Sequence, residues 1–164
     1  MMDMPAHLLY TPDHLWVRID GNRAMIGITE YAQEELGIVV FAELPPLGEK
    51  VRTGLYMSMV ESAKQDMDII APVSGTVVLV NQALASNPMH INTSPYEYGW
   101  ILVIEMSRPE EMEKLWDAKT YQEAYATCRG NKKSGEEESF ARFFYFPIAF
   151  SSLYLAAYLF TVNT

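Results

Sequence analysis

The sequence predicts a small, mainly β protein, built as a sandwich or flattened barrel with short helices and a C-terminal helix. Short runs of strand-like residues alternate with turn residues every roughly eight to twelve positions, which is typical of an all-β domain. The chain has 164 residues, of which 49% are hydrophobic, so it is long enough to bury a core. We therefore expect one ordinary folded domain.

The first strands flank a tight turn and are followed by a short helix. Asp20-Gly21-Asn22 lies between two apolar runs, and an Asp-Gly pair there predicts a β-hairpin because glycine accepts a positive φ. Thr29 is placed to cap a helix that ends at Leu36, and Gly37 is placed to take the left-handed conformation after it. We expect strands over 16–20, 24–28 and 38–42 and a helix over 29–36.

The middle of the chain contains further strand-like runs. The segment 44–48 includes two prolines, which would remove two hydrogen-bond donors from a sheet, so it connects strands. Residues 61–66 predict a polar hairpin tip with Lys64 in its middle, and residues 72–75 predict the next turn. We expect strands over 55–60, 67–71, 76–80 and 100–105, and a helical turn over 82–86 capped by Asn81.

The hydrophobic spacing becomes helical after the last predicted strand. Ser107-Arg108-Pro109-Glu110 has the spacing of a capping box. Three apolar residues would share one face of the helix that follows: Met112, Leu115 and Trp116. Asp117 is placed to start a further helical segment that carries Tyr121 and Tyr125. A helix is therefore expected after the sheet.

Charge and the absence of known motifs exclude several classes of function. The chain has 12 Lys and Arg against 21 Asp and Glu, a net charge of −9, and therefore lacks the positive charge that nucleic-acid binding requires. Its one cysteine, Cys128, excludes an internal disulfide framework, and its three histidines lack metal-ligand spacing. No GxSxG, HExxH or GxxxxGK[ST] motif is present, so the sequence predicts neither catalytic residues nor a metal site.

The composition changes near residue 127, and we expect three parts. Residues 1–127 form the folded domain, and residues 128–142 are mostly polar, which is typical of a solvated linker. Residues 143–164 contain no charge and 16 apolar or aromatic side chains, which is enough for a membrane span of roughly 20 residues. The alternatives for this tail are a buried segment of a larger assembly and a non-native extension.

The start of the chain contains no signal-peptide features. It lacks a basic region, an apolar run of sufficient length and the Arg-rich character of a transit peptide. We therefore expect a cytoplasmic protein or an already mature form, with membrane tethering through residues 143–164 as a further alternative.

Lys64 is the residue whose surroundings suggest a chemical role. A hairpin tip holds a side chain away from the body of a domain, while the two strands determine where it points. That placement suits covalent attachment of a carrier group to the lysine. A solvated surface lysine is the competing explanation, and local context alone favours it.

Seven sequence blocks stand in an order that resembles a known family. They are YTPDHLWV (10–17), GITEYAQ (27–33), FAELP (41–45), VESAK (60–64), APVSG (71–75), NQAL (81–84) and the segment from Ile91-Asn92 through Pro95-Tyr96 to Gly99-Trp100. Over about residues 8–126 the chain resembles the H protein of the glycine cleavage system, a lipoyl carrier protein. The sequence from Cys128 onward has no counterpart in that family.

The resemblance implies a lipoyl/biotinyl-type β hammerhead, a flattened barrel-sandwich hybrid, for the lipoyl-carrier domain of residues 1–127. It implies that Lys64 carries lipoate in amide linkage, and that the protein is a non-catalytic carrier shuttling the aminomethyl group of glycine. The implied partners are glycine decarboxylase (P protein), aminomethyltransferase (T protein), dihydrolipoyl dehydrogenase (L protein) and a lipoate-attaching enzyme. It also places Glu61, Ser62 and His14 in the environment of the lipoyl arm.

Competing explanations exist for these surrounding residues. Glu61, Asp66 and Asp68 are either recognised by a lipoate ligase or by partners, or simply keep the hairpin soluble. His14 either lines a cleft for the arm or is a partly buried histidine that forms hydrogen bonds within the sheet.

Several positions depart from the family pattern. Leu15 replaces a common acidic residue, Ala63 replaces a valine, Gln65-Asp66-Met67 replaces small residues, and Thr93-Ser94 replaces an acidic pair. These changes leave Lys64 in place but leave two alternatives open. One is an H-protein-like lipoyl carrier for sulfur-compound oxidation or lipoate relay, and the other is an unmodified, membrane-tethered binding module.

Overall fold

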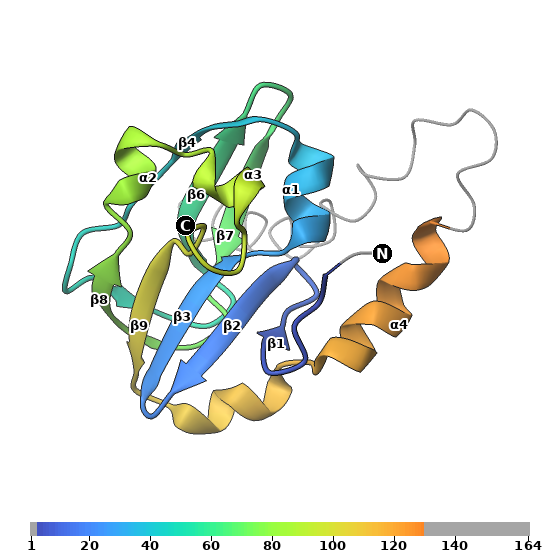
Figure 1. Ribbon diagram of the computed structural model, residues 1–164. Coiled ribbons are helices and arrows are strands. Elements are labelled where there is room, and N and C mark those ends of the chain that lie inside the picture. The colour runs from blue at the N-terminus through green and yellow to red at the C-terminus, as the bar shows by residue number, and fades with distance from the viewer. Residues whose placement is uncertain (1–2, 130–164) are drawn as a thin grey trace, which may run out of the picture. The chain divides into compact units, whose positions relative to one another are not determined.

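The computed structural model describes residues 3–129, and in this range the protein is mainly β, as predicted (Figure 1). Its strands form two sheets rather than a closed barrel. The larger sheet contains, in spatial order, β1 (Leu9–Tyr10), β2 (Leu15–Asp20), β3 (Arg23–Ile28), β9 (Leu102–Met106), β8 (Gly75–Val80) and β5 (Lys50–Val51). The smaller sheet contains β4 (Val39–Ala42), β6 (Tyr56–Ser62) and β7 (Asp66–Ile70).

Short helices connect the strands. They are α1 (Glu30–Leu36), α2 (Ala83–Ser86), α3 (His90–Thr93), the 3₁₀ helix η1 (Pro109–Lys114) and α4 (Ala118–Arg129). Residues 1–126 form one compact unit. Its main core lies between the two sheets and is lined mostly by Leu, Ile, Val and Met side chains. Strands β1 and β5 and helix α3 were not predicted, because each has four residues or fewer and therefore too short a pattern.

The β2–β3 hairpin forms as predicted, and it contains a close backbone approach. Gly21 has a φ of 57°, and Asp20 pairs with Arg23 across the turn. Further along the hairpin Trp16 pairs with Gly27, and a Cβ atom on Gly27 would lie 2.6 Å from the Trp16 ring. Glycine is therefore required beside the buried tryptophan.

Helix α1 begins and ends at the predicted residues. The Ala32 amide donates to Thr29 Oγ1 at 3.2 Å, which is the predicted N-terminal cap. Gly37 has a φ of 76° and a ψ of −147°, and its amide donates to the Gln33 carbonyl at 3.0 Å. The positive φ confirms the need for glycine, although the ψ value differs from that of a left-handed helical residue.

The predicted hairpin tip is shorter than expected. Residues 61–66 were expected to form the tip, whereas β6 continues through Ser62 and β7 begins at Asp66. Glu61 and Asp66 pair directly with each other across the hairpin. Only residues 63–65 remain in the turn, because the Ser62 amide donates to the Gln65 carbonyl at 2.9 Å and closes it there.

The predicted helix after residue 107 is also incorrect in its details. Pro109–Lys114 forms a 3₁₀ helix with no side-chain cap, so Ser107 does not form the capping box. Trp116 does not share a helical face with Met112, because its amide and carbonyl pair with those of Tyr10 at 2.9 and 2.8 Å. In addition, buried Glu111 accepts hydrogen bonds from the amide and hydroxyl of Ser74 at 2.6 and 3.0 Å. These long-range contacts fix the segment in a tighter conformation.

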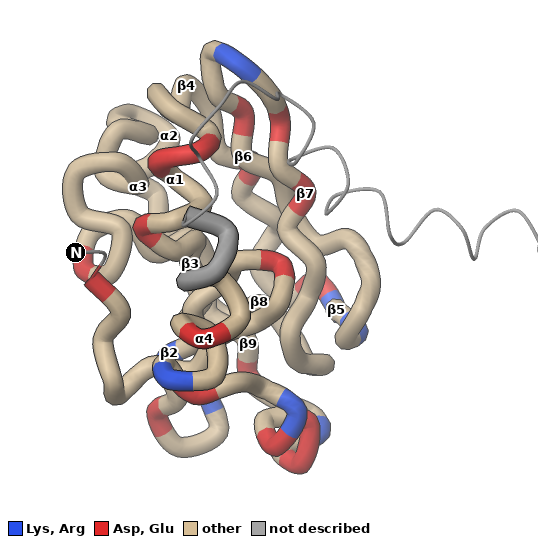
Figure 2. Tube along the Cα trace, turned by 90° about the vertical axis from the view of Figure 1, so that its right-hand side faces the viewer, with Lys and Arg blue, Asp and Glu red and all other residues tan. Residues whose placement is uncertain are grey.

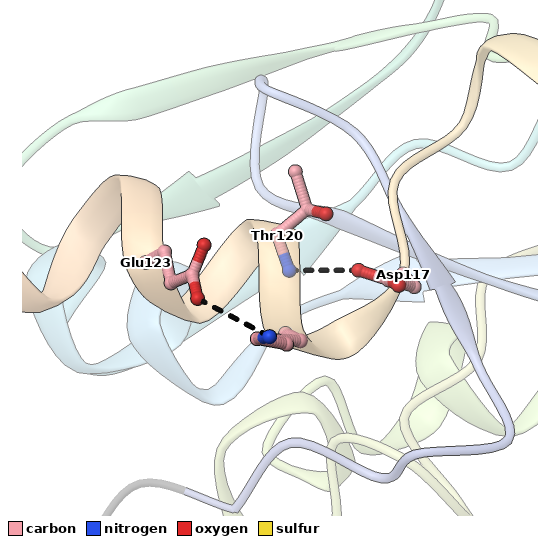
Figure 3. Close-up of polar contacts among 4 residues, drawn as sticks. Asp117, Thr120 and Glu123 are labelled. Atoms are coloured by element: carbon pink, nitrogen blue, oxygen red, sulfur yellow. Dashed lines mark hydrogen bonds and ion pairs between the residues drawn. The ribbon is translucent and has the colours of Figure 1, made fainter.

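Helix α4 begins where the sequence indicated. The Thr120 amide donates to Asp117 Oδ1 at 2.7 Å, and Lys119 forms an ion pair with Glu123 at 3.8 Å (Figure 3). Hydrogen bonding to Asp117 from the Thr120 side chain, and secondly from its backbone amide, lowers the pKa of the Asp117 carboxyl. Tyr121 and Tyr125 are buried in a second, aromatic cluster with Tyr10 and Trp16.

The predicted linker and tail lie mostly beyond the described part of the chain. Helix α4 includes residues 128 and 129, whereas residues 130–142 and the apolar segment 143–164 lie outside the described residues. Within the described residues, none of the helices is long and apolar enough to span a membrane.

Candidate functional site

Lys64 lies in the turn between β6 and β7, and Ser62 holds this turn in shape. The Ser62 hydroxyl accepts hydrogen bonds from the amides of Lys64 and Gln65 at 3.1 and 3.0 Å and donates one to the Gln65 carbonyl at 2.8 Å. A serine hydroxyl has one donor and two acceptor positions, so all of its hydrogen-bonding capacity is used here. The backbone under Lys64 is therefore well defined, although its side chain is exposed.

The turn is also attached to the end of helix α1. The Ala63 amide donates to the Ile38 carbonyl at 3.0 Å. A Cβ atom added to Gly37 would lie 3.4 Å from Lys64 Cε and 3.7 Å from Nζ, so the lysine side chain extends over Gly37. The C-terminal end of a helix carries partial negative charge, which favours an ammonium group at this position.

Asn92, on α3, supports the connection between α1 and β4. Its Nδ2 donates to the Gly37 carbonyl at 2.8 Å and to Gln33 Oε1 at 2.9 Å, and its Oδ1 accepts from the Val39 amide at 2.9 Å. The two backbone partners of Asn92 thus lie on either side of Ile38, whose carbonyl receives the Ala63 amide. No local sequence signal points to this role of Asn92, because its partners are more than 50 residues away along the chain.

The carboxylates near Lys64 project from the hairpin strands. Glu61 pairs with Asp66 on β7 and with Phe41 on β4, and paired residues share a face of the sheet. Among residues 3–129 the structure records no ion pair for Lys64 Nζ. The amine is thus exposed and is not held by a carboxylate.

His14 lies in a different environment from Lys64. Its carbonyl accepts from the Thr29 amide at 2.9 Å, which places His14 at the start of α1, whereas Lys64 lies over the end of that helix. Seven helical residues span about 10 Å. His14 Nδ1 forms a hydrogen bond with the Tyr121 hydroxyl at 2.8 Å, and its ring contacts Tyr31 and Tyr125. Burial lowers the pKa of His14 to about 4.

The structure thus brings together three of the four residues considered as a site, namely Glu61, Ser62 and Lys64, on one hairpin. His14 instead belongs to the aromatic cluster beneath α4. No group of three or more metal-ligating side chains gathers within the described residues. The feature available for chemistry at the hairpin is therefore an accessible primary amine on a fixed turn.

Comparison with known proteins decides the family. The family model described as glycine cleavage H-protein matches residues 8–128. The chain belongs to this H-protein family. The match includes the two sheets and Lys64.

Individual relatives in the H-protein family agree with this assignment. The glycine cleavage system H protein of Brevibacillus brevis is 46% identical over 121 residues, which cover 74% of this chain and 96% of the relative. The mitochondrial H protein 2 of Arabidopsis thaliana is 50% identical over 114 residues, covering 70% of this chain and 73% of the relative.

A solved H-protein structure supports the fold. The crystal structure of the glycine cleavage system H protein from Mycobacterium marinum has 37% sequence identity and a TM-score of 0.69, and covers 74% of this chain and 98% of its own. The predicted fold class is thereby confirmed, with two sheets, short helices and a C-terminal helix.

Proposed function

We propose that this protein is the lipoyl carrier of a glycine cleavage system, with lipoate attached to Lys64. The observation that carries the proposal is the position of Lys64, which is exposed on a turn fixed by Ser62 and by the hydrogen bond from Ala63 to Ile38. Membership of the H-protein family supports the same role. The relatives named above are glycine cleavage proteins, which does not favour the alternative in sulfur-compound oxidation or lipoate relay.

The residues present fit an amide-linked arm. Attachment requires an accessible amine, and Lys64 Nζ is exposed and lacks an ion pair within the described residues. The bound group would supply a disulfide that is reduced as it takes up the aminomethyl group. The chain's own residues would fix the attachment point, because Ser62 orients the Lys64 backbone and Gly37 leaves room for its side chain.

Modification would change the electrostatics of the turn. Converting the Lys64 ammonium into an amide takes the formal charge of the chain from −9 to −10. It also removes the favourable interaction with the end of α1. The unmodified Lys64 side chain would therefore lie over Gly37. The modified side chain would be held there less strongly, because it no longer carries the positive charge.

The partners in this proposal are those of the glycine cleavage cycle. A lipoate-attaching enzyme would modify Lys64, and the P, T and L proteins would then act on the arm in turn. Glycine decarboxylase would load the aminomethyl group with release of carbon dioxide, the aminomethyltransferase would pass its carbon to tetrahydrofolate with release of ammonia, and dihydrolipoyl dehydrogenase would reoxidise the reduced arm. The protein itself is a carrier component and performs none of these steps.

The decisive experiment is an intact-mass measurement of the protein purified from lipoate-competent cells. We expect one lipoyl increment on the wild type, its loss in Lys64→Ala, and its retention in Lys114→Ala, a matched change at another exposed lysine. Lys64→Arg should also lack the increment and fail to support glycine decarboxylation, while unfolding at the wild-type temperature. An unmodified wild-type protein would favour a binding module without an arm.

A further inference from the structure

The small sheet has a solvent-facing side that is both acidic and aromatic. Because side chains alternate along a strand, buried Val60 and Met67 point into the core, while their neighbours along β6 and β7 point outward. We define the outer sheet face by six residues on or beside the three strands: Phe41, Glu43, Tyr56, Glu61, Asp66 and Asp68.

Contacts between these residues support this placement. Phe41 pairs with Glu61, which pairs with Asp66, so these three form one row across β4, β6 and β7. The Tyr56 hydroxyl donates to Glu43, and this hydrogen bond, with the charge of Asp68 adding to its effect, raises the pKa of Tyr56 to about 12. The four carboxylates therefore lie around two aromatic rings.

Both aromatic rings of this face are about half exposed to solvent. Phe41 is 48% exposed and Tyr56 is 53% exposed. Strands β4, β6 and β7 contain no Lys or Arg, and Figure 2 shows acidic positions along β6 and β7. Solubility explains carboxylates on a surface, and the two half-exposed rings among them offer apolar area for contact with another protein. An apolar centre with a charged rim is typical of a protein-binding surface.

The outer sheet face adjoins the attachment point. Its first row contains Asp66, which directly follows the turn that carries Lys64, and Glu61, which precedes Ser62 on the other side of that turn. A protein bound there would have its own reactive groups beside the arm. Lipoylation would strengthen the negative field, because it removes the one positive charge between Glu61 and Asp66.

We propose that the outer sheet face is the docking surface for the enzyme that loads the lipoyl arm, the glycine decarboxylase of the proposed function, which would present Lys and Arg side chains around an apolar patch. This inference rests on the proposed function, since it requires an arm on Lys64. The carboxylates would attract the basic rim of the partner, and Phe41 and Tyr56 would pack against its apolar centre. Docking would lower the KM of the partner for the carrier without altering the chemical step.

The test compares charge-matched variants as substrates of purified glycine decarboxylase, with the fully lipoylated carrier as the varied component. The double variant Asp66→Asn with Asp68→Asn removes two negative charges from the outer sheet face. The control, Glu105→Gln with Glu113→Gln, removes two exposed carboxylates from β9 and η1. A third variant, Phe41→Ser, removes an aromatic ring but no charge. Intact mass establishes lipoylation of each protein, and thermal unfolding establishes its fold.

We expect the double variant of the outer sheet face to raise KM about tenfold at low ionic strength with little change in kcat. The difference should shrink at an ionic strength of about 0.5 M, where charges are strongly screened. Phe41→Ser should raise KM at both ionic strengths, and the control should match the wild type. Docking here is contradicted if the face variants keep the wild-type KM, or if the control raises KM equally. A wild-type protein without a lipoyl increment would overturn the proposed function itself.

Discussion

Ser62 shows how one side chain fixes the turn that carries Lys64. Its hydroxyl contacts the amides of Lys64 and Gln65 and the carbonyl of Gln65, so removing it releases several groups at once. We expect Ser62→Ala to lower the free energy of unfolding by about 1 kcal/mol, measured by urea denaturation. Ser86→Ala, which removes a single exposed hydrogen bond to Ala83, should cost less. If Ser62→Ala and Ser86→Ala lowered the free energy of unfolding equally, Ser62 would have no special role in fixing the turn.

His14 makes stability depend on pH. Its pKa in the folded protein is about 4, below the ordinary value of 6.5, because burial disfavours the charged ring. Between these values the unfolded state binds more protons, so lowering the pH from 6.5 towards 4 should reduce the free energy of unfolding, by about 3 kcal/mol in full.

His14→Asn should flatten this dependence. Asparagine has no titrating group and tolerates the positive φ of 64° at this position. The difference between wild type and variant over pH 4–6.5, measured by urea denaturation at each pH, isolates the contribution of His14 from that of neighbouring carboxyls such as Asp13, whose pKa is raised by burial. If the free energy of unfolding changed with pH in the same way in the wild type and in His14→Asn, His14 would not be the cause of the pH dependence.

At the scale of elements, the connection between α1 and β4 depends on Asn92. We expect Asn92→Ala to lower the free energy of unfolding by about 2–3 kcal/mol, because the Val39 amide and the Gly37 carbonyl lose their partner. Asn92→Asp keeps the acceptor for Val39 but loses both donated bonds, so it should also destabilise. Urea denaturation measures both, with Asn87→Ala on exposed backbone as the control. If Asn92→Ala had the same urea denaturation midpoint as the wild type, Asn92 would not stabilise the connection between α1 and β4.

Local sequence signals were sufficient for some elements and insufficient for others. The β2–β3 turn and the start of α1 depend on residues within four positions of each other, so Gly21 and Thr29 predict them correctly. Segment 109–116 is shaped by Tyr10 and Ser74, which are distant in sequence, and its helical spacing was therefore misleading. Lys64 could be singled out from its turn and from the resemblance, whereas the support from Asn92 required the folded structure.

At the scale of the whole molecule, α4 completes the aromatic cluster. Tyr121 stacks on Tyr10 with ring centres 4.9 Å apart, and its hydroxyl forms hydrogen bonds with both His14 and Thr29. The Tyr125 hydroxyl donates to the Pro12 carbonyl at 2.7 Å. Helix α4 therefore stabilises the segment that leads into β2 and the start of α1, far along the chain from its own position.

This arrangement predicts where the chain can be shortened. Among the residues that the structure describes, every core side chain precedes residue 126, so we expect truncation after Ala126 to leave a folded domain that is lipoylated on Lys64. Truncation after Asp117 removes Tyr121 and Tyr125 and should lower the unfolding temperature markedly, because their partners in the cluster become exposed to water. Thermal unfolding followed by circular dichroism, with intact mass for lipoylation, compares the two truncations with the full chain. If the protein that ends at Ala126 unfolded as readily as the protein that ends at Asp117, residues beyond 126 would belong to the core. The domain boundary near residue 127 would then be wrong.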